Sequence, residues 1–208
     1  MNKKLLKVGK AVVGTALVTT LLTQGYSIIG DVTAKTSKIA DELTPLSLIS
    51  SGDFEKTNTI WKTNNSSIVN ENGNRLGRIG QGVSDGSLLQ YANVKPGKKY
   101  RLTADVKVSY SGTGDTSTMK GVFLSVKNSS YSYDKAVEMN KGQVAEKALQ
   151  YTNGEWRKET IEFTAGDQYD VAVGLIKWTD GNVVGRDAIV DIDNVVLTQI
   201  DKDAEYNY

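Results

Sequence analysis

Hydrophobic and polar residues alternate over much of the chain, a pattern that is typical of β-strands with one buried face. The clearest example is residues 99–110, where every second side chain from Tyr100 to Tyr110 is apolar or aromatic. Other apolar or alternating stretches occupy residues 46–49, 76–79, 87–94, 121–128, 156–164, 170–179 and 187–198. Because turn residues separate these stretches and no long helical pattern occurs, they predict an all-β chain that forms an antiparallel β-sandwich.

The stretch Asp187–Thr198 is predicted to be a central strand, because both of its faces are largely apolar. Strict alternation places Asp193 on the same face as Val195 and Leu197. A carboxylate that points towards a core is costly unless another group pairs with it. We expect that partner in the segment Ser51–Glu55, at the start of the globular region.

Turn signals separate the predicted strands. Asn72-Gly73 and Asp180-Gly181-Asn182 mark two turns, and Lys95-Pro96-Gly97 has the residues of a type II turn. The longest stretch without a clear pattern is Ser129–Glu155. Within it, Lys141–Leu149 fits either one weak helical turn or a strand.

The composition limits the chemistry available to the chain, which has 208 residues, 39% hydrophobic and 24% charged. The absence of cysteine excludes disulfides and thiolate sites, and the absence of histidine excludes Ser-His-Asp and Cys-His catalysis. Paired carboxylates such as Asp191/Asp193 and Glu159/Glu162 are the remaining acid–base candidates, and no known motif surrounds them. We therefore predict that the protein is not an enzyme.

The first 34 residues have the layout of a secretory signal peptide. Four lysines accompany an apolar run from Ala11 to Leu22, and Val32-Thr33-Ala34 provides a cleavage site after Ala34. The alternative is a retained membrane anchor, but polar residues dilute the apolar run too strongly for a good spanning helix. We expect a secreted protein without stable membrane insertion, divided into a signal peptide (1–34), a leader (35–45), one domain (46–200) and a tail (201–208).

Cleavage after Ala34 changes the charge balance. It removes 4 of the 25 basic residues and 1 of the 24 acidic residues, so the mature chain has 21 minus 23, or a net charge of −2. This balance gives no electrostatic basis for binding nucleic acid or anionic lipid. We therefore predict no nucleic-acid partner.

Several motifs occur in the order of a known family. They are Gly52-Asp53-Phe54-Glu55, Lys95-Pro96-Gly97-Lys98-Lys99-Tyr100, Trp156 before Ile161-Glu162-Phe163-Thr164-Ala165, and Asp193-Asn194-Val195-Val196-Leu197. Together, over roughly residues 46–198, they resemble carbohydrate-binding modules of the family 4/9/22 type. The resemblance implies a galactose-binding-domain-like jelly roll and a polysaccharide or cell-surface glycan as the ligand.

The resemblance also implies a structural calcium ion. Its ligands would be Glu55 and Asp193, with oxygen atoms around Gly52 or Asp53. Calcium takes about six to eight oxygen ligands, and carboxylates from the first and last strands would clamp the sandwich together. The alternative is that Asp193 accepts backbone N–H hydrogen bonds, or meets a lysine, without an ion.

Trp178 is the first candidate for stacking on a sugar ring, because aromatic faces bind the apolar faces of sugars. The small residues Ala172 and Gly174 on the same strand face would leave a trough beside its ring. The alternative is that Trp178 packs under the Ser129–Glu155 loop. We expect the other two tryptophans, Trp61 and Trp156, in the core.

Tyr110 and Tyr133 are the next aromatic candidates, and with Tyr131 and Tyr151 they could rim a binding cleft. Arg101 and Asp105 would orient sugar hydroxyl groups. The strand face that carries the last two residues also fits ordinary cross-strand charge pairing, which is the interpretation we favour. This predicted charged face comprises Arg101, Asp105, Lys107, Lys127, Lys158 and Glu162.

Two functions follow from these observations. The first is a secreted, non-catalytic glycan-binding protein, which the family resemblance favours. The second is a protein-interaction or toxin-associated module that contacts a protein partner through the Ser129–Glu155 loop. The charged rather than aromatic face of the strand after the Pro-Gly turn favours the second.

Overall fold

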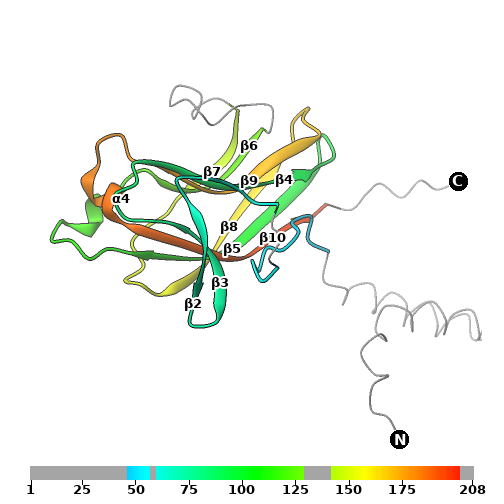
Figure 1. Cartoon of the computed structure of the whole chain (residues 1–208). Coiled ribbons are helices and arrows are strands. Elements are labelled where there is room, and N and C mark those ends of the chain that lie inside the picture. The colour runs from blue at the N-terminus through cyan, green and yellow to red at the C-terminus, as the bar shows by residue number, and fades with distance from the viewer. Residues whose placement is uncertain (1–45, 57–59, 129–141, 202–208) are drawn as a thin grey trace, which may run out of the picture. The chain divides into compact units, whose positions relative to one another are not determined.

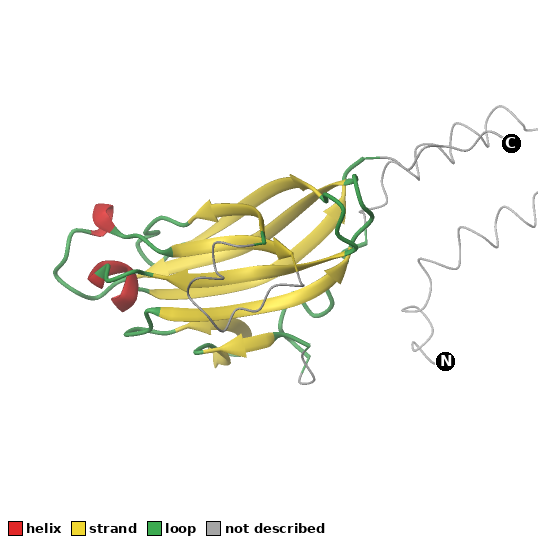
Figure 2. Cartoon of the chain, turned by 90° about the horizontal axis from the view of Figure 1, so that it is seen from above, coloured by secondary structure: helices red, strands yellow, loops and turns green. Residues whose placement is uncertain are grey.

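The computed structural model describes residues 46–56, 60–128 and 142–201. These residues form two antiparallel five-stranded sheets that pack face to face (Figures 1 and 2). The predicted signal peptide, leader and most of the tail lie outside the described residues. Of the described helices, none is long and apolar enough to cross a membrane.

The two sheets are named A and B. Sheet A contains, in spatial order, β1 (Lys62–Asn64), β4 (Asp85–Asn93), β9 (Asp170–Trp178), β6 (Val122–Asn128) and β7 (Gln143–Ala148). Sheet B contains β2 (Ser67–Glu71), β3 (Asn74–Ile79), β10 (Ile189–Gln199), β5 (Lys99–Ser109) and β8 (Trp156–Thr164). This arrangement is the predicted antiparallel β-sandwich, and its strand order is that of a jelly roll.

Four short elements differ from the sequence-based expectation. β1 and β2 were not predicted, because both are short and largely polar. The turn expected at Asp180-Gly181-Asn182 continues into α4 (Val183–Asp187), whose first turn is capped by Asn182 Oδ1 accepting from the Gly185 N–H at 2.7 Å. A single turn of 3₁₀-helix, η1 (Thr116–Thr118), lies between β5 and β6. The stretch Lys141–Leu149, for which the sequence allowed either a helical turn or a strand, contains the strand β7.

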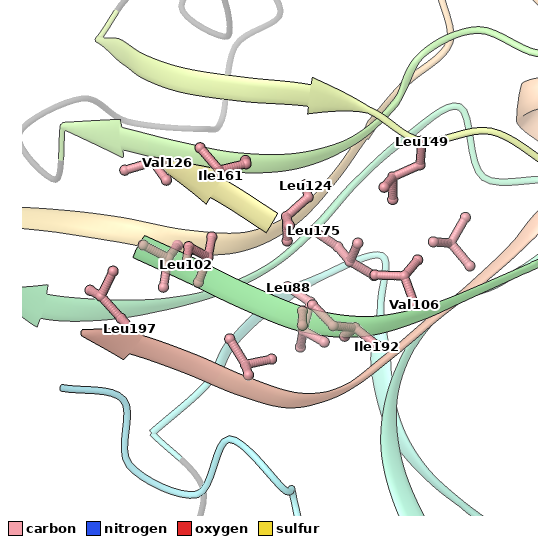
Figure 3. Close-up of a cluster of buried hydrophobic side chains, with 14 of the residues drawn as sticks. Leu88, Leu102, Val106, Leu124, Val126, Leu149, Ile161, Leu175, Ile192 and Leu197 are labelled. Carbon is pink, nitrogen blue, oxygen red and sulfur yellow. The ribbon is translucent and has the colours of Figure 1, made fainter. Parts of the chain in front are cut away.

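The core lies between the sheets and is built from the alternating residues that the pattern identified. The inward face of β5 runs from Tyr100 to Val108 in steps of two, and all of these side chains are buried. Figure 3 shows this layer, with Leu102 and Val106 of β5 near Leu88 and Leu175 of sheet A. Trp61 is also in the core, as predicted, with its ring stacked on Phe54 at 4.8 Å between centroids.

β10 does not alternate strictly, which corrects the prediction for its carboxylates. A bulge lies between Asp193 and Val196, where Asn194 adopts a left-handed conformation with φ of 50°. Before the bulge Val190 and Ile192 are buried in the core, and after it Val195 and Leu197 are. Asp191 and Asp193, which pair with Lys107 and Asp105, therefore lie on the outer face of sheet B and not towards the core.

The segment Ser51–Glu55 lies against this bulge, but the hydrogen-bond partners of Asp193 are Asn74 and Asn194 rather than a residue of that segment. The Val195 N–H donates to the Gly52 carbonyl at 2.9 Å. A Cβ atom on residue 52 would lie 1.9 Å from the Val195 carbonyl oxygen, so glycine is required at this position. The start of the domain is thereby joined to its last strand.

Candidate functional site

A pocket of about 250 Å³ lies at the end of the sandwich that carries α4, and we call it the α4-end pocket. Its lining combines aromatic, hydroxyl, amide and carboxylate groups: Ser109, Tyr110, Ser111, Tyr151, Asn153, Gly154, Asp187 and Ile189. These residues come from the end of β5, the loop between β7 and β8, and the connection from α4 into β10. The antiparallel pairing of Ser109 with Ile189 brings the first and last of these segments together.

The loop between β7 and β8 holds Tyr151 in place through its neighbour Thr152. The Thr152 side chain is buried, and its Oγ1 accepts the Val108 N–H at 2.9 Å while the Thr152 N–H donates to the Val108 carbonyl at 3.2 Å. Asn153 and Gly154 then reverse the chain with positive φ angles of 58° and 75°. The Tyr151 hydroxyl donates to Asn153 Oδ1 at 3.0 Å, so its ring and this amide form one rigid unit.

Tyr110 is fixed from the opposite side of the pocket. Its hydroxyl accepts the Gly114 N–H at 3.1 Å. Gly112 also lies against the ring, because a Cβ atom at residue 112 would come within 2.3 Å of the Tyr110 hydroxyl oxygen. Tyr110 and Tyr151 are both half-buried and pack against the hydrophobic core. The two rings are therefore held in position before any ligand arrives.

Asp187 is the carboxylate of the pocket, and a buried lysine positions the turn that carries it. The Lys177 Nζ donates to the carbonyls of Gly80, Arg186 and Ala188 at 3.0, 2.7 and 2.6 Å. Burial lowers the pKa of Lys177 to about 8, so the ammonium is still charged at neutral pH. The Arg186 guanidinium, hydrogen-bonded to Asp187, lowers the pKa of that carboxyl, which keeps Asp187 anionic.

This set of groups suits a small ligand that has both apolar faces and many hydroxyl groups. Tyrosine rings offer flat apolar surfaces, while the serine hydroxyls, the Asn153 amide and the Asp187 carboxylate offer hydrogen-bond donors and acceptors. Drug-sized ligands occupy pockets of roughly 300–1,000 Å³. The smaller α4-end pocket therefore fits a single ring or the end of a chain rather than a long segment.

Trp178 lies elsewhere, on the outer face of sheet A, at the end of β9. It is half-buried and packs against a small apolar cluster of Leu89, Ala172 and Ile176. Leu89 pairs with Gly174 across the strands, and Ile176 occupies the position between Gly174 and Trp178 on this face. Large apolar side chains therefore occupy the position where the sequence predicted an open trough.

Arg101 and Asp105 lie on the outer face of sheet B, so the structure does not bring them together with Trp178. Arg101 forms an ion pair with Glu162 at 2.6 Å. Asp105 accepts the Asn194 side-chain amide at 3.0 Å and lies 3.4 Å from the Lys158 ammonium. These contacts confirm the predicted cross-strand pairing. Tyr133 lies outside the described residues.

One in-register row crosses all five strands of sheet B: Ser67, Arg78, Asp191, Lys107 and Trp156. Asp191 is buried, accepts two hydrogen bonds from the Arg78 guanidinium and lies 3.1 Å from the Lys107 ammonium. Glu71 Oε2 completes the cluster at 3.0 Å from both cations. Every charged group of the row thus has a protein partner.

Two residues, Trp156 and Lys127, do not lie where the sequence predicted them. Trp156 is 41% exposed rather than in the core, because the alternation that turns Ile161 and Phe163 inward turns Trp156 outward. The Lys107 ammonium lies 5.0 Å from the centre of its ring, a cation–π contact. Lys127 is not part of this face, since it belongs to β6 in sheet A and is buried.

The predicted calcium ligands lie near the bulge in β10. Asp193 Oδ1 accepts the backbone Asn194 N–H at 2.7 Å, a bond of the kind named in the ion-free alternative, and Oδ2 accepts the Asn74 side-chain amide at 3.0 Å. Burial raises the pKa of Asp193, and the negative charges of Asp105 and Glu55 raise it further. The charge of Glu55 therefore acts on Asp193.

Asp53 has a different neighbourhood, since its Oδ1 accepts the Glu55 N–H at 3.4 Å and it lines a cavity with Lys56 and Asn194. In the ranges that the structure describes, no group of three or more Asp, Glu, His or Cys side chains is arranged to hold a metal. A calcium ion here would be held by the Glu55 and Asp193 carboxylates together with amide and carbonyl oxygens.

The sequence pointed to two residues of the α4-end pocket: Tyr110 as a predicted ligand-binding residue, and Tyr151 as an aromatic that could rim a cleft. It did not indicate Asn153 or Asp187 as site residues, because they meet Tyr110 only through the register of β5 with β10 and the loop clamped by Thr152. The one local signal was the Asn153-Gly154 pair two residues after Tyr151, which marks a tight turn.

Comparisons with known proteins identify the fold. A family 4 carbohydrate-binding module superposes with a TM-score of 0.50 at 12% identity, over 73% of this chain and 99% of that one. The xylan-binding CBM22-1 domain of Paenibacillus barcinonensis Xyn10C gives 0.50 at 14% identity, over 77% and 100%. The tandem CBM22-1–CBM22-2 domain of the same protein gives 0.51 at 14% identity, over 80% and 49%.

The chain has the jelly-roll fold of carbohydrate-binding modules. No protein-family model matches the sequence, and no curated protein matches it. The fold predicted from the ordered motifs is thereby confirmed from structure. The ligand must be argued from the site, because one fold carries many functions.

Proposed function

We propose that this protein is a secreted, non-catalytic glycan-binding protein that holds one sugar residue, or one chain end, in the α4-end pocket. The observation that carries the proposal is the pair of tyrosines in that pocket, which are anchored on the core and surrounded by hydroxyl, amide and carboxylate groups. Sugar rings stack on aromatic faces, and their hydroxyls hydrogen-bond to the polar rim. A polysaccharide or cell-surface glycan supplies both features.

The lining of the pocket supports binding without catalysis. Glycoside hydrolysis uses two carboxyl groups on opposite sides of the scissile bond. Among the described residues that line the α4-end pocket, Asp187 is the only acid, and it is paired with Arg186 at 2.8 Å. Secretion is supported by the lysine-rich, apolar N-terminal segment with its small-residue cleavage motif.

A glycan array followed by titration calorimetry tests the proposal. We expect the wild-type protein to bind neutral or cell-surface glycans, and Tyr151→Ala to weaken that affinity at least ten-fold because a stacking surface is lost. Tyr151→Phe keeps the ring and removes the hydrogen bond to Asn153, so it should weaken binding by a smaller factor. Lys62→Ala changes an exposed side chain of β1, outside the pocket lining, and is the control.

Thermal unfolding of each variant separates a lost binding surface from a lost fold. The proposal is wrong if the folded wild-type protein binds no glycan, or if Tyr151→Ala and Tyr110→Ala both bind as tightly as the wild type. A parallel pull-down from target cells tests the protein-partner alternative. Much of the loop that the alternative invokes, Ser129–Glu155, lies outside the described residues.

A structural calcium ion at Glu55 and Asp193 is a second part of the proposal. It is supported by the raised pKa of Asp193, because two neighbouring negative charges and burial make its carboxylate unfavourable without a cation. A bound cation would offset that repulsion and join the first segment of the domain to β10. Asp53, beside Glu55, would contribute through the backbone oxygens of its turn.

A further inference from the structure

The end of the sandwich opposite α4 carries a second cavity, of about 550 Å³, which we call the β8–β9 pocket. Its lining comes from the end of β6 and from the loop between β8 and β9: Asn128, Asp167, Gln168, Tyr169 and Asp170. In Figure 1 this loop and α4 lie at opposite ends of the sheets. None of these residues belongs to the α4-end pocket.

The length of β9 shows how far apart the two pockets lie. Asp170 is the first residue of β9 and lines the β8–β9 pocket, whereas Lys177, near the other end, binds the carbonyls on both sides of Asp187. A strand advances about 3.3 Å per residue, so the nine residues of β9 span roughly 26 Å. A short oligosaccharide in one pocket therefore does not reach the other.

The β8–β9 pocket presents one exposed aromatic ring, that of Tyr169, and a second exposed tyrosine lies on β4 at the same end of sheet A. Tyr169 is 74% exposed, more than any other large hydrophobic or aromatic residue in the described domain except Leu46. Its carbonyl accepts the Val94 N–H at 2.8 Å, which fixes its backbone to the end of β4. Tyr91, 45% exposed, lies on the outer face of β4 two residues before Asn93, which pairs with Asp170. Two exposed tyrosines thus flank the same end of sheet A.

The polar groups of the pocket determine the class of ligand. Two carboxylates and two amides can accept and donate hydrogen bonds to neighbouring hydroxyl groups. The described lining contains no lysine or arginine, so a uronic acid or sulfated sugar would meet only negative charge. The combination of a tyrosine ring, carboxylates and amides fits a neutral saccharide.

We propose that the β8–β9 pocket is a second saccharide-binding site, specific for a neutral saccharide, in which Tyr169 stacks on a sugar ring and Asp167 and Gln168 bind its hydroxyls. This inference rests on the proposed glycan-binding function, and it adds bivalency to it. Two sites at opposite ends of one rigid domain engage two glycan chains at once. Binding to a surface that displays many chains then exceeds the affinity of either site alone.

Titration calorimetry with neutral trisaccharides of xylose, glucose and galactose tests this inference, with galacturonate trisaccharide as the charged comparison. For a neutral trisaccharide that binds, we expect two molecules per wild-type chain and one molecule per Tyr169→Ala or Tyr151→Ala chain. The double variant should bind none. Tyr169→Ala should also weaken retention on the matching polysaccharide at least ten-fold, and Lys62→Ala, which lies in neither pocket lining, should change neither quantity.

The outcomes separate the two proposals. Because Tyr169 is largely exposed, Tyr169→Ala should keep the wild-type melting temperature, so its effect reports on binding. A wild-type stoichiometry of one that Tyr151→Ala abolishes and Tyr169→Ala leaves intact overturns the second site and leaves the proposed function standing. A stoichiometry of one that only Tyr169→Ala abolishes overturns the α4-end site instead. Tighter binding of galacturonate than of neutral trisaccharides at the β8–β9 pocket overturns the assigned ligand class.

Discussion

The outer face of sheet B and the α4-end pocket both present aromatic rings and paired polar groups, including Asp187 with Arg186 in the pocket, but only the pocket leaves open space beside them. On sheet B the row from Ser67 to Trp156 pairs every charge with a neighbour, and Lys107 covers the ring of Trp156. In the α4-end pocket the two tyrosines and Asp187 line an open cavity.

This difference separates a structural polar surface from a binding surface. A ligand that approached the sheet B row would have to replace strong charge-assisted bonds with its own, which gains little. A ligand in the pocket meets groups that already have fixed positions and open space beside them, so little ordering is required. The predictions below test this contrast, beginning with the largest expected effect.

Asp191→Ala should cost the most stability. Asp191 is 1% exposed, and its removal leaves Arg78 and Lys107 without their central anion. Breaking a buried ion pair by removing one partner costs about 3–5 kcal/mol, and because both cations keep some solvent contact we expect about 3 kcal/mol. Urea unfolding measures the change. Glu162→Ala, which breaks the exposed pair with Arg101, is the control and should cost less than about 0.5 kcal/mol.

The contrast between the two surfaces also predicts what Asp191→Ala leaves unchanged. Its saccharide affinity should stay within about two-fold of the wild type at a temperature where both are folded. Equal stability of Asp191→Ala and wild type would show that the row does not hold sheet B together. A large loss of affinity in the folded variant would place the ligand on this face.

Lys177→Met should have the next largest effect, because it leaves the carbonyls of Gly80, Arg186 and Ala188 without their shared donor. A buried acceptor that loses its partner costs about 1–3 kcal/mol, and we expect a total of about 2 kcal/mol, since the ammonium is itself costly to bury. Chemical denaturation measures it, with Lys62→Met on the exposed strand β1 as the control. No difference between the two variants would contradict the structural role of Lys177.

Calcium should give a smaller, concentration-dependent stabilisation. If Glu55 and Asp193 share an ion, free calcium at ten times its Kd stabilises the fold by about 1.4 kcal/mol, and chelation removes that gain. Differential scanning calorimetry with and without a chelator measures the shift. Glu55→Ala should abolish it, whereas Glu162→Ala should retain it. A wild-type melting temperature that does not respond to calcium would support the alternative, in which the amides of Asn74 and Asn194 alone satisfy Asp193.

Arg101→Ala should have the smallest effect on both stability and binding. Arg101 is half-exposed, and its ion pair with Glu162 crosses two strands on the surface of sheet B. Exposed pairs contribute about 0–1 kcal/mol, so we expect a change below about 0.5 kcal/mol and no change in saccharide affinity beyond two-fold. A ten-fold loss of affinity on titration would restore Arg101 as a residue that orients hydroxyl groups.

Much of the fold could be predicted from the sequence, because long alternating strands report their own buried face. The predicted bounds of β8 agree with the structure, and those of β5 and β9 differ by one residue. Trp156 was misplaced since tryptophan is usually buried, while the phase set by Ile161 and Phe163 turns it outward. The alternation of buried and exposed positions in β8 therefore predicts the orientation of Trp156 better than the general preference of tryptophan for burial.

The site was less predictable, because it depends on events at single residues and on distant contacts. The left-handed conformation of Asn194 reverses the faces of β10, and nothing in strict alternation indicates where such a bulge falls. The α4-end pocket requires the clamp of Thr152 on Val108 and the pairing of Ser109 with Ile189. Tyr110 was identified because it ends a clear strand, whereas Tyr169 lies in a loop with no pattern around it.

A crystal structure of the protein with a bound neutral oligosaccharide, chosen from the array, tests the central proposal most directly. We predict a sugar ring stacked against Tyr110 or Tyr151, with its hydroxyls within hydrogen-bond distance of Asn153 or Asp187. A sugar bound only on the outer face of sheet B, or only beside Trp178 on sheet A, would contradict the assignment of the α4-end pocket as the binding site.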